Sequence, residues 1–368
     1  MLTSAQFDEL IVPIMDLFAE YETSVLVDIA RRLAKLAIPS AAWQVQRITE
    51  SGSLYKDVLK KLSQLTGQSE KEIADLLREA GVQTIKFDDK VYKVAGLKPL
   101  PLNLSPAMAQ TLKAGIDKLN AVVLNLTRTT AITAQQAFIR ASNLAYQQVI
   151  TGAMSYDQAI RAAIKNVAAE GLHVIDYASG HTDHLDVAIR RNVLTGVAQT
   201  AGQLQVTRAE EMGSDLVAVS AHVGARNKGT GPMNHESWQG QIYSRGGAHP
   251  KYPNFVERTG YGTGEGLAGW NCRHSFYPFF EGLSSPPEPV KEKRVTLDGK
   301  EMSLYEASQV QREAERKVRH WKRQAQALEA ARLDNLKETM RVRQWQARLR
   351  SIVQQTGLVR QYAREQVQ

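Results

Sequence analysis

The sequence predicts a mainly α-helical protein that carries a small α+β module, and three observations support this fold class. Apolar residues recur at helical spacing, between helix start and stop signals, through the first 214 residues. Short apolar runs then alternate with loops rich in Gly, Pro, Asn and aromatic residues up to residue 289. A long charged run of helix-forming residues ends the chain. We therefore expect four segments: a helical N-terminal region with a small hairpin (1–104), a long-helix region (105–214), a compact mixed α/β module (215–289), and a hairpin followed by a long basic helix (290–368).

The first segment is expected to form helices separated by turns. Ser69 followed by Glu72 has the spacing of a capping box, which starts a helix, and Gly81 is a typical helix stop. The run 84–96 alternates polar and apolar residues around two aspartates and predicts a small hairpin. A proline-containing connector follows, so we place the boundary of this segment near Leu104.

The second segment carries the strongest helix signals of the chain. Ser105 followed by Pro106 predicts an N-cap with proline at the first helical position, which opens a pair of long helices. Ser155 and Gln158 form a second capping box, and the helix that they start is expected to end at Gly171. One further long helix fills the rest of the segment.

The two C-terminal segments combine short strands with one long helix. The apolar runs 216–222 and 241–244 predict strands, and the Asp-Gly turn within 295–302 predicts a hairpin. The helix-forming run 303–355 would be on the order of 80 Å long if it were continuous. Its apolar stripe changes phase near Val342, where we expect the helix to bend or break.

Composition narrows the class of protein. The chain has 368 residues and a single cysteine, so it forms no intrachain disulfide. No stretch has the length and apolar character of a membrane span, and the N-terminus lacks the pattern of a secretory signal, which together favour a protein that stays in a cytoplasm and has no membrane partner. The formal net charge is +8, and all of this excess lies in residues 290–368, where 18 Lys and Arg face 10 Asp and Glu. Such asymmetry indicates a polyanionic partner for the tail.

A stripe of cations follows one face of the expected C-terminal helix. At 100° per residue its members fall within a sector of about 60°, and they are Arg312, Arg316, Arg319, Arg323, Lys337, Arg341 and Arg348. One interpretation is a solvated surface without a specific partner. The other is contact with the DNA backbone, independent of base sequence and steeply dependent on salt.

The candidates for metal chemistry are His222, His235, Cys272 and His274, and the last three form the candidate zinc site. On an extended segment the side chains of Cys272 and His274 point to the same side, and His235 lies in a loop that could supply a third zinc ligand. The same cysteine could instead be a buried structural thiol in an aromatic wall, or a nucleophile with Glu236 or Glu265 nearby. We therefore expect no obligatory cofactor and keep zinc as a candidate. The neighbouring glycine series 260–269 lacks the Lys-Ser/Thr of a phosphate-binding loop and predicts a flexible or backbone-exposing loop.

The order of several motifs resembles a known family. SAHVGAR, HESWQGQIYS, TGYGTGEGLAGWNCRHSFYPFFEG and LDGKEMSLYEAS follow one another as they do in the phage minor capsid protein 2 family, a relative of the Mu F-like head morphogenesis proteins. The likeness covers roughly residues 105 to 330 and includes the run Asn271 to His274. The resemblance implies a structural protein, not an enzyme, of the head of a tailed double-stranded DNA phage. It also implies a low copy number of several per virion, a position near the portal, and assembly in the host cytoplasm. The implied partners are the portal or major capsid protein and the packaged DNA.

Two other functions remain open from the sequence. A toxin-like or metal-dependent enzymatic domain at residues 181–285 would bring Arg190 or Arg191 together with His235, Glu236 and His274 in one pocket. A free DNA-binding factor would use the basic tail outside any virion.

Overall fold

The computed structural model describes residues 2–40, 42–175, 180–247, 249–288, 290 and 293–367. The chain divides into two compact units, and each is assembled from three separate stretches of sequence. Unit 1 comprises Met1–Pro13, Glu70–Val122 and Arg190–Ser308, and unit 2 comprises Ile14–Ser69, Val123–Ile189 and Gln309–Gln368. Of the four segments expected from the sequence, 215–289 lies within one unit and each of the others contributes to both.

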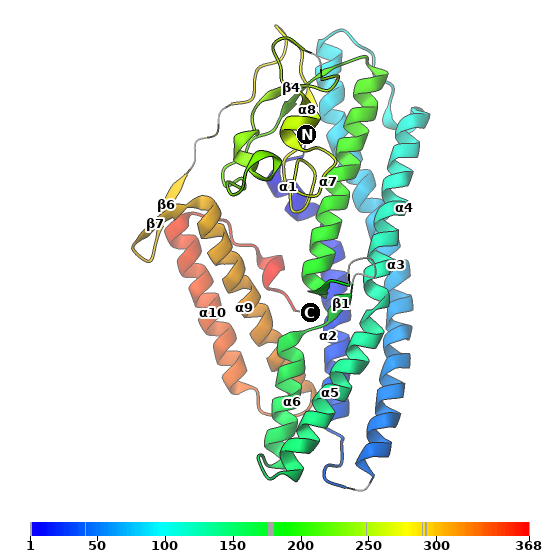
Figure 1. Ribbon diagram of the computed structural model, residues 1–368, viewed down its shortest axis with the longest axis vertical. Helices are drawn as coiled ribbons and strands as arrows, with labels where there is room; N and C mark the ends of the chain where they lie inside the picture. The colour runs from blue at the N-terminus through cyan, green and yellow to red at the C-terminus, as the bar shows by residue number, and fades with distance from the viewer. Residues whose placement is uncertain are drawn as a thin grey trace. The chain divides into compact units, whose positions relative to one another are not determined.

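The prediction of a mainly helical fold with a small α+β module is confirmed (Figure 1). The α-helices of the described residues are α1 (Ser4–Leu10), α2 (Val12–Leu33), α3 (Trp43–Val94), α4 (Pro106–Arg128), α5 (Thr130–Ile150), α6 (Tyr156–Glu170), α7 (Leu185–Glu211), α8 (Phe255–Thr259), α9 (Leu304–Ala330) and α10 (Leu336–Thr356). Four short 3₁₀ helices are η1 (Leu102–Leu104), η2 (Gly231–Met233), η3 (His235–Ser237) and η4 (Tyr362–Glu365). The strands are β1 (His173–Ile175), β2 (Thr182–His184), β3 (Leu216–Val219), β4 (Ile242–Ser244), β5 (Phe276–Pro278), β6 (Arg294–Leu297) and β7 (Lys300–Ser303). Within the described part of the chain, none of these helices is both long enough and apolar enough to cross a bilayer.

The hairpin expected at residues 84–96 is wrong, because helix α3 continues through it to Val94. Ile85, Asp88 and Tyr92 are all buried, and their spacing is that of one helix face rather than of a strand. The expected helix start at Ser69 and the expected stop at Gly81 are wrong too, because α3 runs without a break from Trp43 to Val94. A Cβ atom on Gly81 would come within 2.9 Å of the Leu204 side chain, so Gly81 serves close packing of helices in unit 1. The helix ends instead at Gly96, which has φ +81°.

Other helix signals are confirmed at the predicted residues. The backbone N–H of Met108 donates to the Ser105 hydroxyl at 3.2 Å, as expected of an N-cap for α4. Ser155 and Gln158 form a complete capping box at the start of α6, and this helix ends at Gly171, which has φ +70°.

The small module of unit 1 is built on a three-stranded antiparallel sheet in the order β4-β3-β5. The predicted strand runs form β3 and β4, and the aromatic run after Cys272 supplies β5. In the register of the sheet, Ala218 of β3 lies between Ile242 of β4 and Tyr277 of β5. Alternate side chains of these strands therefore face one buried cluster, which contains Val217, Val219, Trp238, Tyr243, Phe255, Leu267, Cys272 and Phe276.

The C-terminal run is two helices, α9 and α10, which lie side by side in unit 2 (Figure 1). The chain turns at residues 331–335, and the break expected near Val342 is wrong. Helix α9 ends in a Schellman motif: the N–H of Leu333 donates to the carbonyl of Leu328, and the N–H of Arg332 donates to Glu329. Arg332 takes the left-handed position with φ +59°, where glycine is usual, so no glycine marked this turn in the sequence.

Candidate functional site

The structure brings together the three residues that the sequence singled out as a candidate zinc site. His235 opens η3, and Cys272 and His274 lie on the extended stretch that leads into β5. All three side chains are buried, and one ligand atom from each lies within 4.8 Å of those of the other two. We call these three residues the His-Cys cluster.

Hydrogen bonds determine which nitrogen of each cluster histidine carries its proton. Burial lowers the pKa of His235 to about 4, so this imidazole is neutral at neutral pH. Its Nε2 lies 2.8 Å from the carbonyl oxygen of Glu265, which can only accept, so Nε2 donates and Nδ1 keeps the lone pair.

A glutamine amide determines the tautomer of the second histidine. The backbone N–H of His222 donates to Oε1 of Gln239 at 3.0 Å, which identifies that atom as the amide oxygen. The Nε2 atom of His274 lies 3.0 Å from the same oxygen and must therefore donate to it. Burial, together with the nearby histidines and Arg226, lowers the pKa of His274 well below its usual value. The Nδ1 atom of neutral His274 thus faces Cys272 with its lone pair.

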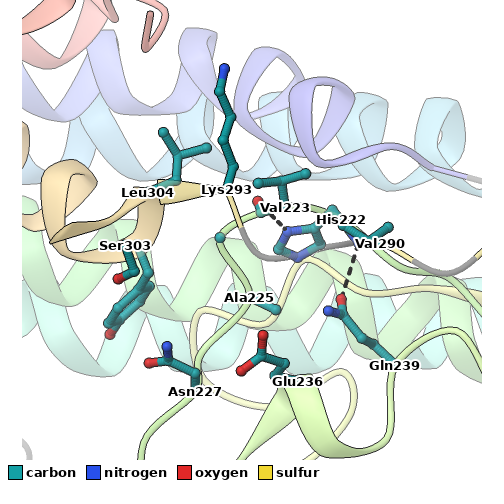
Figure 2. Close-up of a pocket in the computed structure, with 12 residues that line it drawn as sticks. His222, Val223, Ala225, Asn227, Glu236, Gln239, Val290, Lys293, Ser303 and Leu304 are labelled. Atoms are coloured by element: carbon teal, nitrogen blue, oxygen red, sulfur yellow. Dashed lines mark hydrogen bonds between the residues drawn. The ribbon is translucent and has the colours of Figure 1, made fainter. Parts of the chain in front are cut away.

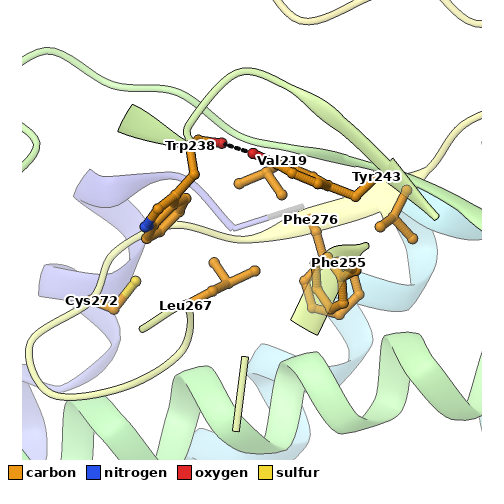
Figure 3. Close-up of a cluster of buried hydrophobic side chains, with 8 residues drawn as sticks. Val219, Trp238, Tyr243, Phe255, Leu267, Cys272 and Phe276 are labelled. Carbon is orange, nitrogen blue, oxygen red and sulfur yellow. Dashed lines mark hydrogen bonds between the residues drawn. The ribbon is translucent and has the colours of Figure 1, made fainter. Parts of the chain in front are cut away.

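The Cys272 thiol lies against His274 in an apolar wall. Its Sγ atom is 3.6 Å from Nδ1 of His274, and the residue is 1% exposed. Figure 3 shows it beside Leu267 and below Trp238. Burial raises the pKa of the thiol, which is the opposite of the activation that a cysteine nucleophile needs. A packed thiol or a metal ligand therefore fits this position better than a nucleophile does.

The glycine series is a tightly folded loop rather than an open one. A Cβ atom on Gly266 would come within 2.3 Å of the carbonyl oxygen of Gly260, and one on Gly269 within 2.4 Å of that of Gly264. Only glycine allows the backbone to approach itself so closely. This folding places the carbonyl of Glu265 against His235, a contact that the sequence analysis missed.

A pocket of about 280 Å³, a volume that includes open solvent, lies beside the Gln239 side chain. Figure 2 shows His222, Glu236 and Gln239 among its lining residues. The enzymatic alternative required Glu236 and an arginine to join the cluster histidines. Glu236 lines this pocket. The guanidinium of Arg190 instead pairs with Asp8 at 2.6 Å. His235 and His274 do meet, with their ring centroids 5.4 Å apart.

Two cations of the predicted stripe are engaged by carboxylates inside unit 2. Arg323 is 8% exposed, and one of its terminal nitrogens lies 3.4 Å from Glu22. Arg319 lies 2.9 Å from Asp186. Both arginines hold α9 against other parts of the unit, a role that a helical wheel cannot reveal.

The remaining stripe residues divide by exposure. Arg316, Lys337 and Arg341 are exposed, and Arg312 and Arg348 are partly buried. Arg341 of α10 also lies over the ring of Trp321 of α9, 5.9 Å from its centroid, which ties the two helices together. Further exposed cations of the α9-α10 pair, which the stripe did not include, are Lys317, Arg332, Arg343 and Arg350. Exposed acidic residues on the same helices and turn are fewer, namely Glu306, Glu313, Glu329 and Asp334.

Comparisons with known proteins match nearly the whole chain to one family. The model of the family described as phage minor capsid protein 2 matches residues 2–354. A structural protein of Lactococcus phage LL-H is 26% identical over 337 residues, which cover 88% of each chain. A structural protein of Lactococcus phage mv4 is 37% identical over 123 residues, which cover 32% of this chain and 94% of that relative. No solved structure matches this chain.

Proposed function

The chain belongs to the phage minor capsid protein 2 family, and from this premise we propose that it is built into the virion near the portal in few copies and contacts packaged DNA through α9 and α10. Membership makes it a phage structural protein, associated with other components of the virion. The description of the family as minor supports a low copy number. Portal and major capsid proteins are the partners proposed for the rest of the surface.

The exposed charge of the α9-α10 pair is the observation that supports DNA contact. Exposed Lys and Arg outnumber exposed Asp and Glu on these helices and on the turn between them. Lysine and arginine that neutralise phosphates release condensed counterions, which supplies affinity without reading the base sequence. We assign no base-reading role to α9 or α10, because contacts with phosphates carry no sequence information.

Buried ion pairs keep the two helices in place beneath this charged surface. Glu338 of α10 is fully buried and pairs with Lys165 at 2.7 Å and Arg161 at 3.0 Å, both on α6. Burial opposes its ionisation, but the hydrogen bond from Lys165 and the two positive charges lower the pKa of this carboxyl. Arg319 and Arg323 fix α9 in the same way. The exposed cations are thus displayed on a rigid support, which favours a lasting contact with a polyanion.

Salt-dependent binding of duplex DNA tests the proposed contact. The full chain and the variant Lys337→Gln/Arg341→Gln are titrated with a duplex of mixed sequence at several salt concentrations. Each lost phosphate contact should reduce the slope of log affinity against log salt by about 0.9, so the double variant should lose close to 2. Lys60→Gln/Lys86→Gln removes two exposed charges from α3 and serves as the matched control, for which we expect no change. Equal slopes for both variants and the parent would refute contact through α10.

A further inference from the structure

We propose that His235, Cys272 and His274 bind a zinc ion, which joins η3 to the stretch leading into β5 within the small module of unit 1. This role goes beyond the proposed virion function and does not depend on it. It uses the one sulfur and two ring nitrogens that the fold gathers in the His-Cys cluster.

The distances of the cluster suit a tetrahedral zinc. With Zn–S of about 2.3 Å and Zn–N of about 2.0 Å, tetrahedral angles place sulfur and nitrogen about 3.5 Å apart. The Sγ atom of Cys272 lies 3.6 Å from Nδ1 of His274, already at that separation. The ligand atoms of the trio lie within 4.8 Å of one another, so the wider pairs must approach by roughly 1 Å on binding.

The hydrogen bonds around the cluster have the form that metal-binding histidines require. A ligating histidine usually donates its other ring N–H to a carbonyl or carboxylate, which fixes the ring and its tautomer. His235 donates Nε2–H to the carbonyl of Glu265, and His274 donates Nε2–H to the amide oxygen of Gln239. Both histidines are therefore left with the Nδ1 lone pair, and the one on His274 points at the cysteine sulfur.

Binding of zinc displaces the Cys272 proton, which leaves as H⁺ while the sulfur forms the Zn–S bond as thiolate. Three protein ligands leave one tetrahedral position for water. Among the described residues, the cluster contains no Asp or Glu, and a sulfur and two imidazoles favour zinc over calcium or magnesium.

The absorbance of bound cobalt tests the proposal without requiring any activity. Cobalt(II) is titrated into the metal-free full chain. A tetrahedral site with one thiolate should give a sulfur-to-cobalt charge-transfer band in the near ultraviolet and strong visible bands, and zinc should abolish both when one equivalent per chain is added. Elemental analysis of the purified chain should find zinc in the same ratio.

Two variants separate a metal site from a packed thiol. Cys272→Ser should lose the charge-transfer band and the bound zinc while it keeps the helical circular dichroism of the parent. His222→Gln is the matched control: this ring stacks on His274 with a centroid distance of 4.3 Å but lies outside the cluster, so the variant should still bind cobalt. If the parent chain gives no thiolate band with cobalt, or if zinc binding survives in Cys272→Ser, the proposal is overturned. The cobalt titration of the parent chain can overturn the proposal by itself, so the test does not depend on whether Cys272→Ser folds.

Discussion

The ion pair between Glu22 and Arg323 gives the sharpest test of how the basic helix is held. Glu22 lies on α2 and Arg323 on α9, and both residues are nearly buried, at 5% and 8% exposed. Arg323 also donates from Nε to the carbonyl of Ala168 at 3.2 Å. Replacing Glu22 by Gln keeps an amide oxygen that can still accept from the N–H of Leu172, a bond of 2.9 Å in the parent. The substitution therefore removes the negative charge, and it places an amide NH₂, which only donates, where the Oε2 atom of Glu22 accepts from Arg323.

The expected loss of stability follows from the burial of the arginine. Removing one partner of a buried ion pair generally costs about 3 to 5 kcal/mol, because the other charge remains without compensation in a medium of low polarity. Arg323 retains its contact with Ala168, so we expect the lower end, about 3 kcal/mol. The free energy of unfolding of the Glu22→Gln variant is measured by urea denaturation, followed by far-ultraviolet circular dichroism. Hydrogen exchange of the α9 amides then locates the change.

A double variant distinguishes a lost attraction from an isolated charge. Glu22→Gln/Arg323→Met removes both partners, and methionine fills much of the volume of the arginine stem, so this variant should be more stable than Glu22→Gln alone. A loss below about 0.5 kcal/mol in Glu22→Gln would show that the Glu22 carboxylate does not hold Arg323 in place, since surface substitutions have effects of that size.

Two further predictions concern unit 1, and a glycine of unit 2 provides the control for the second. Burial raises the pKa of Asp88 to about 7, so this carboxyl is neutral in the folded chain below that pH but ionises near 3.9 when unfolded. The free energy of unfolding should therefore fall as pH rises from about 4 to 7 and then level off. In Asp88→Asn, whose amide oxygen can still accept from Gln205, the free energy of unfolding measured with urea should differ less between pH 5 and pH 8, by up to about 3 kcal/mol. The same difference in the variant as in the parent would contradict this prediction. Gly115→Ala should destabilise by about 1 to 3 kcal/mol in the same assay, because its Cβ would lie 2.5 Å from the hydroxyl oxygen of Thr200. The exposed helical Gly67 has nothing within 4 Å, so Gly67→Ala should be stabilising by up to about 1 kcal/mol, and equal effects at the two glycines would rule out the packing argument.

Local signals predicted much of the helical framework, and tertiary packing decided the exceptions. The caps at Ser105 and Ser155 depend on neighbours within three residues, which the sequence shows directly. The same spacing at Ser69 starts no helix, because α3 continues through it. The alternation after residue 84 is equally compatible with a strand and with one face of a helix. Burial of Ile85 and Tyr92 on the same side decides for the helix. The turn at Arg332 escaped prediction because a non-glycine residue takes the left-handed conformation there.

In the candidate site, too, local signals predicted some features and tertiary packing decided the others. The spacing of Cys272 and His274 on an extended segment predicted that both would face one side, and the structure places His235 with them. The supporting contacts of Gln239 and Glu265 depend on how a long loop folds back, which no spacing reveals. In the basic stripe, periodicity placed the cations on one face but did not show that Arg323 meets a carboxylate 301 residues away.

We expect this chain to lie in the virion with α10 facing packaged DNA, and photo-cross-linking inside intact phage heads can detect that contact. A photoreactive amino acid replaces either Arg341, which is exposed, or Arg323, which is buried, in the phage that encodes the chain. Purified heads are irradiated and the chain is analysed for attached DNA. We predict that the probe at position 341 attaches to DNA and that the probe at position 323 attaches to protein alone. Heads that lack the chain, or a probe at position 341 that attaches only to protein, would contradict the account.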